Sequence, residues 1–340
     1  MKDDAVNVPA EWAPQKAIWT AWPADPNEWN GDLASPRHDV AAMVRALSGS
    51  NSAMNKVRVL AKGAEALASA RRDLGNAAEV VAANYGDIWL RDTGPIFARA
   101  GGAHVALRFA TNSWGGKYDL PDDATVGDDI ARLATTPIRR FEFVLEGGAV
   151  DHDGSGTILT TRQTLLNPNR NGWMKADAEA ALHKAFGTKK TIWIDEGLRN
   201  DHTDGHIDNI ARFVGPGRVV CQSPAGPDDP NADTLNQIAH ILEGATDARG
   251  HKLEVVRIPG VGLYRNALGD ISPASHMNFI IGNGVVVAPV YGTATQDAAL
   301  KALQKVFLDR KVVGVSSRGL LGCGTAGGGS FHCITQQEPA

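Results

Sequence analysis

The chain has 340 residues, of which 43% are hydrophobic and 21% are charged; this is the composition of a globular protein and excludes disordered and fibrous classes. The formal net charge is -4, and acidic and basic residues are interspersed along the sequence. Because no basic stripe could follow a phosphate backbone, we expect no nucleic-acid partner.

Neither the N-terminal segment nor the cysteines indicate secretion. Residues 1–9 carry acids near the start and lack the apolar stretch of a secretory signal, and no later run is long and apolar enough to span a bilayer. Cys221, Cys323 and Cys333 form no CxxC pair and leave one thiol over in any disulfide scheme. They also lack zinc-finger spacing. We therefore expect a cytoplasmic protein without a membrane partner or a metal.

Five segments with the apolar spacing of an amphipathic helix are each followed by a short run of strand composition. In chain order, these helix and strand segments are 40–47 and 57–60, 126–133 and 141–145, 175–186 and 191–194, 231–243 and 253–258, and 295–307 and 311–316. In the second half of the chain, helix starts recur about every sixty residues, which indicates one supersecondary unit per repeat.

Two of the units also contain a hairpin signal. Residues 210–214 and 219–220 flank Gly215-Pro216-Gly217, and residues 279–281 and 285–287 flank Asn283-Gly284. Such turns are typical of antiparallel strands and disfavour the alternative of an open, doubly wound sheet. Because no stretch resembles a linker, residues 1–340 are expected to form a single α/β domain. We predict a five-bladed α/β propeller of ββαβ units whose strand ends meet at one central site.

Four short, polar, glycine-rich segments interrupt the repeat: residues 87–95, 145–148, 203–209 and 327–335. Loops of this kind on a rigid scaffold are where binding and catalytic residues concentrate. The last segment contains Cys333 after three glycines, which allow the backbone to approach a ligand closely. Taken alone, Cys333 fits a small core residue better than a reactive thiol, so its role depends on the other segments.

His206 and Asp208 lie two residues apart in a run that we interpret as the start of a strand, so their side chains are expected to point into the same space. A histidine can donate a proton to a leaving amine and then take one from water. Glu146 is assigned to orienting or charging His206, because a buried carboxylate needs a partner. The alternatives are a solvated strand end for the pair and a surface turn for Glu146.

Asp92 closes a segment that also contains Trp89 and Arg91. A carboxylate beside an aromatic wall suits a planar cation, which it can bind through two hydrogen bonds while the ring stacks on it. Trp114, which precedes two glycines, is a second candidate for a wall of the pocket. The alternative is that Arg91 forms a local salt bridge that neutralises Asp92.

Together, these residues favour the hydrolysis of a guanidinium compound. Its central carbon is a poor electrophile because three nitrogens share the positive charge, so the reaction needs a strong nucleophile and carboxylates that hold the nitrogens. Cys333 supplies the first, and Asp92 and Asp208 supply the second. The sequence contains neither a GxSxG nucleophile elbow nor a GxxxxGK[ST] phosphate loop.

Seven motifs along nearly the whole chain resemble, in order, those of the agmatine deiminases, members of the guanidine-modifying pentein superfamily. They are AIWTAWP at 17–23, DIWLRDTGP at 87–95, NSWGGKY at 112–118, LEGG at 145–148, LLNPNRN at 165–171, DGHIDN at 204–209 and HCITQQEP at 332–339. So many matches in one order are highly specific for the family.

This resemblance implies a five-bladed pentein propeller without a metal or organic cofactor. The implied reaction converts agmatine to N-carbamoylputrescine and ammonia, toward putrescine, through an amidino-cysteine intermediate. The resemblance places the nucleophile at Cys333, the acid and base at His206 and its carboxylate partner at Glu146. It places the guanidinium-binding carboxylates at Asp92 and Asp208. The expected partner is a small cationic guanidine, and a homodimer is the base-rate expectation for assembly.

Three positions depart from the family pattern. His202 stands where an acidic residue is common, His276 where tyrosine is common, and Gln163 where glutamate is common. An imidazole attracts a second cation less than a carboxylate does, so His202 bears on recognition of the distal ammonium of agmatine. The alternatives are a deiminase of another guanidine such as peptidyl arginine, an amidino-group transferase, or a non-catalytic protein that binds polyamine-like cations.

Overall fold

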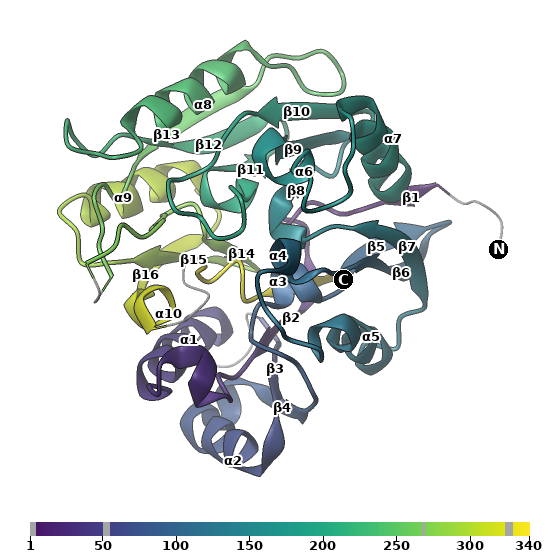
Figure 1. Ribbon diagram of the computed structural model, residues 1–340, viewed down its shortest axis with the longest axis vertical. Coiled ribbons are helices and arrows are strands. Elements are labelled where there is room, and N and C mark those ends of the chain that lie inside the picture. Colours follow the sequence, from purple (N-terminus) through teal and green to yellow (C-terminus); the bar gives the residue numbers. More distant parts are fainter. Residues whose placement is uncertain (1–4, 50–54, 267–268, 324–328) are drawn as a thin grey trace.

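The computed structural model describes residues 5–49, 55–266, 269–323 and 329–340. Within these residues, the strands form five small sheets. The sheets are arranged in a ring, with the longer helices on its outside (Figure 1). The short helices α3 (Leu90–Thr93) and α4 (Ser113–Gly116) lie near the middle of this view. The arrangement confirms the predicted α/β fold of repeated units.

Two sheets are built mainly from residues 96–194. The first has the strand order β1 (Val6–Asn7), β5 (Ile96–Ala100), β6 (Ala103–Ala110) and β7 (Ile138–Val144), and helix α5 (Asp123–Leu133) precedes β7. The second has the order β10 (Lys190–Ile194), β9 (Thr157–Thr161) and β8 (Val150–His152), and helices α6 (Arg162–Leu165) and α7 (Lys175–Phe186) precede β10.

Two further sheets come from the second half. The third has the order β11 (Ala211–Gly215), β12 (Arg218–Ser223) and β13 (Glu254–Pro259), with helix α8 (Ala232–Gly244) before β13. The fourth has the order β14 (Ile280–Gly282), β15 (Val285–Val290) and β16 (Lys311–Ser316), with helix α9 (Gln296–Val306) before β16 and α10 (Arg318–Cys323) after it.

The fifth sheet joins the two ends of the chain. Its order is β17 (Gln336–Pro339), β2 (Gln15–Ala21), β3 (Val57–Ala61) and β4 (Glu79–Ala82), with helices α1 (Ala34–Ser48) and α2 (Gly63–Leu74). Short 3-10 helices complete the described structure: η1 (Pro26–Trp29), η2 (Gly75–Ala77), η3 (Gly147–Ala149) and η4 (Ile207–Asn209).

Each sheet contains the same motif, in which an antiparallel pair of strands is followed by a helix and a third strand parallel to the second. Both predicted hairpins are confirmed, as β11 with β12 and β14 with β15. Gly284 has a φ of 72° in the second of these turns, a left-handed conformation that glycine adopts without strain. The open, doubly wound alternative is wrong, because no sheet of the described strands exceeds four strands.

The outer helices form because their apolar residues recur at helical spacing. Helix α8 buries Leu235, Ile238, Ala239 and Leu242, which lie on one stripe. Helix α7 ends at Gly187, which has a φ of 69° and donates its backbone N–H to the preceding turn. Since each helix packs on its own part of the ring, the hydrophobic core is divided into separate clusters around it.

The ring is closed by strands from the two ends of the chain. Strand β17 pairs antiparallel with β2, which places Gln336 opposite Trp19. Next to this pair, the buried carboxylate of Glu338 accepts a hydrogen bond from Nε1 of Trp19 (2.9 Å) and one from Nζ of Lys16 (2.6 Å). The closure holds the residues before β17 at the middle of the molecule, where α3 contacts η3 and η3 contacts η4.

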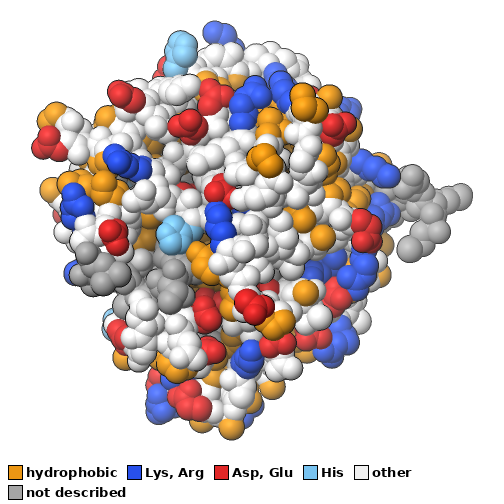
Figure 2. Space-filling model, viewed as in Figure 1, with side chains coloured by type: hydrophobic (Ala, Val, Ile, Leu, Met, Phe, Trp, Pro, Cys, Tyr) orange, Lys and Arg blue, Asp and Glu red, His pale blue; other side chains and the backbone are white. Residues whose placement is uncertain are grey.

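The face shown in Figure 2 carries acidic and basic side chains in a mixed arrangement, without a continuous band of one sign. None of the helices in the described part of the chain combines the length and the apolar composition that a bilayer crossing requires.

The ring closure can be tested through Glu338. We expect Glu338→Ala to lower the free energy of unfolding by about 1.5 to 3 kcal/mol, because a charge-assisted hydrogen bond is lost and the buried indole N–H of Trp19 is left unpaired. Lys16→Met is the matched control and should cost less than about 1 kcal/mol, because this partner is mostly exposed. Urea denaturation measures both values. An equal decrease in the free energy of unfolding in the two variants would contradict the proposed importance of the buried hydrogen bond between Glu338 and Trp19.

Candidate active site

Asp92 lies in the one-turn helix α3, and two other segments fix its carboxylate. Its Oδ1 accepts a hydrogen bond from the backbone N–H of Gly148 (2.8 Å), and its Oδ2 accepts one from Nε1 of Trp114 (2.9 Å). Arg91 makes no ion pair with Asp92 in the described structure, and its Nε donates instead to the carbonyl of His332 (3.3 Å). The alternative in which Arg91 neutralises Asp92 through a local salt bridge is therefore wrong.

The two tryptophans predicted as pocket walls are placed differently. Trp114 supports Asp92 directly and has a φ of 54°. This left-handed conformation costs roughly 1 to 2 kcal/mol, and such strain is concentrated at functional sites. Trp89 is buried, and its Nε1 donates to Asp87 (2.8 Å). It packs on Gly329 so closely that a Cβ there would lie 2.2 Å from the indole ring.

The predicted strand start at His206 and Asp208 is wrong, because residues Ile207–Asn209 form the 3-10 helix η4 and strand β11 begins after it. Both side chains nevertheless reach the same space, where Gly148 leaves room for them. A Cβ at Gly148 would lie 2.6 Å from Nδ1 of His206 and 3.0 Å from Oδ2 of Asp208. It would also lie 3.0 Å from Oδ1 of Asp92. Asp92 of α3 therefore converges at this glycine with His206 and Asp208 of the η4 segment.

The thiol of Cys333 is buried and faces the same group of carboxylates. Its Sγ lies 3.5 Å from Oδ2 of Asp208, and Nδ2 of Asn278 donates to the sulfur (3.0 Å). Oδ1 of Asn278 also accepts the backbone N–H of Cys333 (3.2 Å), so one amide fixes both the backbone and the thiol. Of the three glycines before the cysteine, Gly327 and Gly328 lie outside the described residues.

Glu146 is buried in an ion pair, so the alternative of a surface turn is wrong. Its Oε1 accepts from Nε of Arg170 (2.7 Å), and Nη1 of Arg170 donates to Asp204 (3.0 Å). No hydrogen bond joins Glu146 to His206 within the described ranges, and the role of Glu146 in orienting His206 stays a prediction. Nδ1 of His206 lies 3.8 Å from Oδ2 of Asp92.

Four buried polar atoms of this cluster have no hydrogen-bond partner among the described residues. They are Oδ1 of Asp208, Oε2 of Glu146, and both ring nitrogens of His206. Buried polar atoms are otherwise nearly always paired, and carboxylate oxygens only accept. The cluster therefore matches a ligand that is rich in N–H groups. In the same described part of the chain, no group of three or more His, Cys, Asp or Glu side chains is arranged to hold a metal ion.

Burial and mutual repulsion act on the acids of this site. Burial raises the pKa of Asp92 well above its ordinary value, and the charges of Asp208 and Glu146 add to the effect. Burial also raises the pKa of Glu146, although the charge of Arg170 opposes it. For Asp208, burial acts in the same direction, but the hydrogen bond and the charge of His332 help to outweigh it, so the pKa is lowered.

The thiol and the imidazole are held in their neutral forms. Burial raises the pKa of Cys333 well above its ordinary value, and the charges of Asp208 and Asp92 contribute. Burial lowers the pKa of His206 to about 3, against the charge of Asp208. A cation bound between the two aspartates would offset their charges and thereby favour the thiolate.

Sequence reasoning missed three residues that contact the predicted ones, Arg170, His332 and Asn278, and a fourth, Glu11, that contacts His332. Arg170 and His332 lie inside motifs that match the family, so the resemblance could have indicated them. For Asn278, the only indication in the sequence is that it lies two residues after His276, which departs from the family pattern. Glu11 has no sequence signal, because it reaches His332 (3.1 Å) only through the fold.

The two histidines that depart from the family pattern have different surroundings. His202 is exposed, and its Nδ1 lies 2.9 Å from the hydroxyl of Tyr118, which packs edge-on against Trp114. His276 is buried, and its Nδ1 lies 2.9 Å from the carbonyl of Pro289. His202 is thus linked through one tyrosine to a predicted site residue, whereas His276 supports the backbone of β15.

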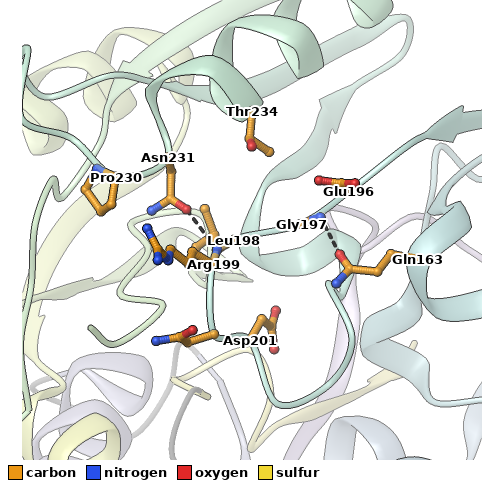
Figure 3. Close-up of a pocket in the computed structure, with 10 residues that line it drawn as sticks. Gln163, Glu196, Gly197, Leu198, Arg199, Asp201, Pro230, Asn231 and Thr234 are labelled. Atoms are coloured by element: carbon orange, nitrogen blue, oxygen red, sulfur yellow. Dashed lines mark hydrogen bonds between the residues drawn. The ribbon is translucent and has the colours of Figure 1, made fainter. Parts of the chain in front are cut away.

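The third departure, Gln163, lines a polar cavity of about 410 Å³ next to the loop that leads to His206 (Figure 3). Oε1 of Gln163 accepts the backbone N–H of Gly197 (2.9 Å), and Oδ1 of Asn231 accepts that of Arg199 (2.8 Å). Both side chains therefore fix the backbone of this loop. None of the seven predicted site residues lines the cavity.

Comparison with known proteins identifies the family of this chain. The family model described as Porphyromonas-type peptidyl-arginine deiminase matches residues 7–339. The chain is 35% identical to the agmatine deiminase of Stutzerimonas stutzeri, covering 100% of this chain and 97% of that protein. It is also 35% identical to the agmatine deiminase of Pseudomonas fluorescens, covering 99% and 96%.

A solved structure supports the same assignment. The agmatine deiminase of Enterococcus faecalis superposes with a TM-score of 0.91 at 30% identity, covering 98% of this chain and 96% of that one. The resemblance inferred from the seven motifs is confirmed, and with it the pentein fold. The chain belongs to the Porphyromonas-type peptidyl-arginine deiminase family.

Proposed function

We propose that the protein hydrolyses agmatine to N-carbamoylputrescine and ammonia through an amidino-cysteine intermediate on Cys333, as a step in putrescine and polyamine biosynthesis. One observation carries the proposal: an imidazole and two aspartates converge beside Gly148, and a buried thiol contacts one of these aspartates. The relatives that are 35% identical over nearly the whole chain are named agmatine deiminases, which favours the same reaction here.

The guanidinium group of agmatine is a planar cation whose N–H groups match carboxylate oxygens. Trp114 and Gly148 orient Asp92, and Oδ1 of Asp208 has no hydrogen-bond partner among the described residues, so both aspartates can accept bonds from the substrate. Burying two carboxylates together is unfavourable unless a cation pairs with them. Bound guanidinium therefore relieves a repulsion that the fold imposes on Asp92 and Asp208.

In the first half-reaction, the substrate charge offsets the aspartates that hold Cys333 as a thiol, and His206 takes the thiol proton. The thiolate adds to the guanidinium carbon. The bond from this carbon to a terminal nitrogen then breaks, and His206 returns the proton to that nitrogen, which leaves as ammonia. A cationic amidino group stays bound to the sulfur.

In the second half-reaction, water adds to the same carbon and gives a proton to His206. The carbon–sulfur bond breaks, the electron pair stays with the sulfur, and Cys333 recovers a proton from His206. The oxygen becomes the ureido carbonyl of the product. The remaining proton is released and is balanced by the ammonia, so that the products are N-carbamoylputrescine and ammonium.

A second candidate substrate is arginine within a peptide. The matching family model is described for peptidyl-arginine deiminases, and His202 stands beside Tyr118 at a position where the family pattern has an acid. Both observations favour a substrate whose distal end is not a second cation. A non-catalytic cation-binding protein is disfavoured, because the thiol, the imidazole and both aspartates are present together. For assembly and location, we propose a homodimer in the cytoplasm.

The nucleophile is tested with a panel of agmatine, free arginine and a peptidyl arginine, by assaying ammonia and the ureido product. We expect Cys333→Ala to lower turnover on the order of 10³-fold or more, while calorimetry still detects substrate binding. Cys221→Ala is the control and should keep full activity, because that thiol is buried in the third sheet. Ammonia release by Cys333→Ala would exclude Cys333 as the nucleophile, and turnover of the peptide alone would exclude agmatine as the substrate.

The convergence at Gly148 is tested with Gly148→Ala. The added methyl group would displace His206 and both aspartates, and a misplacement of about 1 Å can cost roughly 100-fold in rate. We expect kcat/KM to fall by about that factor. Gly244→Ala, where nothing lies within 4 Å of the added Cβ, should leave kcat/KM unchanged. If Gly148→Ala retained wild-type kinetics, the proposed assembly of the site would be refuted.

The coupling of charge to the thiol is tested by alkylation between pH 6 and 9. Burial, together with the charges of Asp208 and Asp92, raises the pKa of Cys333, so neutral chloroacetamide should react slowly, and its rate should increase as the pH rises. Chloroacetamidine, its cationic counterpart, should react more than tenfold faster at pH 7.5, because each unit by which its charge lowers the pKa gives about ten times more thiolate. The rates with free glutathione correct for intrinsic reactivity. If the corrected rates of chloroacetamidine and chloroacetamide were nearly equal, the proposed effect of the substrate charge on the thiol would be contradicted.

A further inference from the structure

Behind Asp208, the structure contains a buried chain of groups that the proposed reaction does not use. Nδ1 of His332 lies 2.8 Å from Oδ2 of Asp208, and Nε2 of the same ring lies 3.1 Å from Oε2 of Glu11. All three side chains are at most 8% exposed. One imidazole therefore bridges two carboxylates directly next to the nucleophile in the sequence.

The geometry determines how this imidazole is protonated. An ionised carboxylate only accepts hydrogen bonds, so both contacts can be hydrogen bonds only if both ring nitrogens of His332 carry a proton. Glu11 is held in its ionised form, because its Oε2 also pairs with Nη2 of Arg212 and its Oε1 accepts the backbone N–H of Ile281 (2.7 Å). When Asp208 is ionised as well, the two contacts require His332 to be an imidazolium held between Glu11 and Asp208.

The main chain leaves this ring little freedom. The backbone N–H of His332 donates to Oδ1 of Asn278 (2.9 Å), and its carbonyl accepts from Nε of Arg91 (3.3 Å). Since both ring nitrogens are already engaged by carboxylates, His332 cannot exchange protons with a substrate without breaking a buried ion pair. It is thus distinct in role from His206, whose ring nitrogens have no hydrogen-bond partner in the described residues.

A comparison of the two aspartates shows what the imidazolium does. Asp92 receives only neutral donors, from Gly148 and Trp114, and burial raises its pKa. Asp208 is equally buried, yet its pKa is lowered, because the hydrogen bond and the charge of His332 help to outweigh burial. The contact also occupies Oδ2 of Asp208, and Oδ1 is the oxygen without a partner in the described chain.

We propose that His332, fixed by Glu11, is a positioning residue that keeps Asp208 ionised and presents its Oδ1 to the guanidinium group of the substrate. The inference rests on the proposed function, because it assigns Asp208 to substrate binding. It adds a second layer of residues to the site, because the N-terminal Glu11 acts on the substrate-binding carboxylate of Asp208 through His332, which precedes the proposed nucleophile.

The test is the pH dependence of kcat/KM for His332→Gln and Glu11→Gln, with agmatine as substrate. Without the imidazolium, the pKa of Asp208 rises, so the acidic limb of the profile should move to higher pH. KM at pH 7.5 should rise roughly 10- to 100-fold, the range expected for one lost charge-assisted hydrogen bond, and kcat should change less. Glu11→Gln should shift the limb in the same direction, since it no longer stabilises the charged ring.

His251→Gln is the matched control. His251 is also paired with an aspartate, Asp247, but its side chain is 73% exposed, so its loss should change neither KM nor the acidic limb. A purely structural role for His332 would lower kcat at every pH and leave the limb in place. An unmoved limb with unchanged KM in both His332→Gln and Glu11→Gln would overturn the proposal.

A spectroscopic measurement separates this inference from the proposed function. In wild-type protein labelled with 15N-histidine, we expect one ring to show two protonated nitrogens at pH 7.5, and this signal should be absent from His332→Gln. Glu11→Gln identifies the signal if His332→Gln does not fold. A neutral ring at His332 would refute the inference even if agmatine is hydrolysed. Conversely, an imidazolium signal in a wild-type protein that does not hydrolyse agmatine would refute the proposed function alone.

Discussion

The pairing of β17 with β2 is the constraint on which the rest of the site depends. It closes the ring of sheets by joining the two ends of the chain. Cys333 and His332 lie just before β17, and Glu11 lies just before β2, so the same closure brings the segment of the proposed nucleophile and an N-terminal carboxylate together.

The central site also illustrates how a fold tolerates many buried acids. Other carboxylates here form ion pairs with cationic side chains of the protein: Glu146 pairs with Arg170, and Glu11 pairs with Arg212. Asp92 is the exception, because its hydrogen bonds come from neutral groups. A buried charge without a partner of opposite sign is unfavourable. In the proposed function, the guanidinium group of the substrate supplies this partner for Asp92. In the proposed function, specificity for a guanidinium group follows from which acids the protein does not neutralise.

Much of the fold and part of the site could be predicted from the sequence, because both leave local signals. The helical spacing of Leu235, Ile238 and Leu242 predicts the buried face of α8 correctly, because this helix packs on a sheet that is close to it in the sequence. Asp92, His206, Asp208 and Cys333 stand in short polar segments and do converge. The prediction of a strand at His206 was wrong, because the chain forms a 3-10 helix there, and the alternation of side chains in the sequence does not indicate one. Glu11 and Arg212 were missed, because tertiary contacts alone define their role.

The most direct measurement of the central claim is an intact-mass analysis of protein quenched in acid during turnover of agmatine, followed by peptide mapping. If Cys333 is the nucleophile, an adduct equal in mass to agmatine minus ammonia is expected on the peptide that contains Cys333, and it should disappear when the substrate is exhausted. Product formation without such an adduct, or with the adduct on another residue, would contradict covalent catalysis by this thiol.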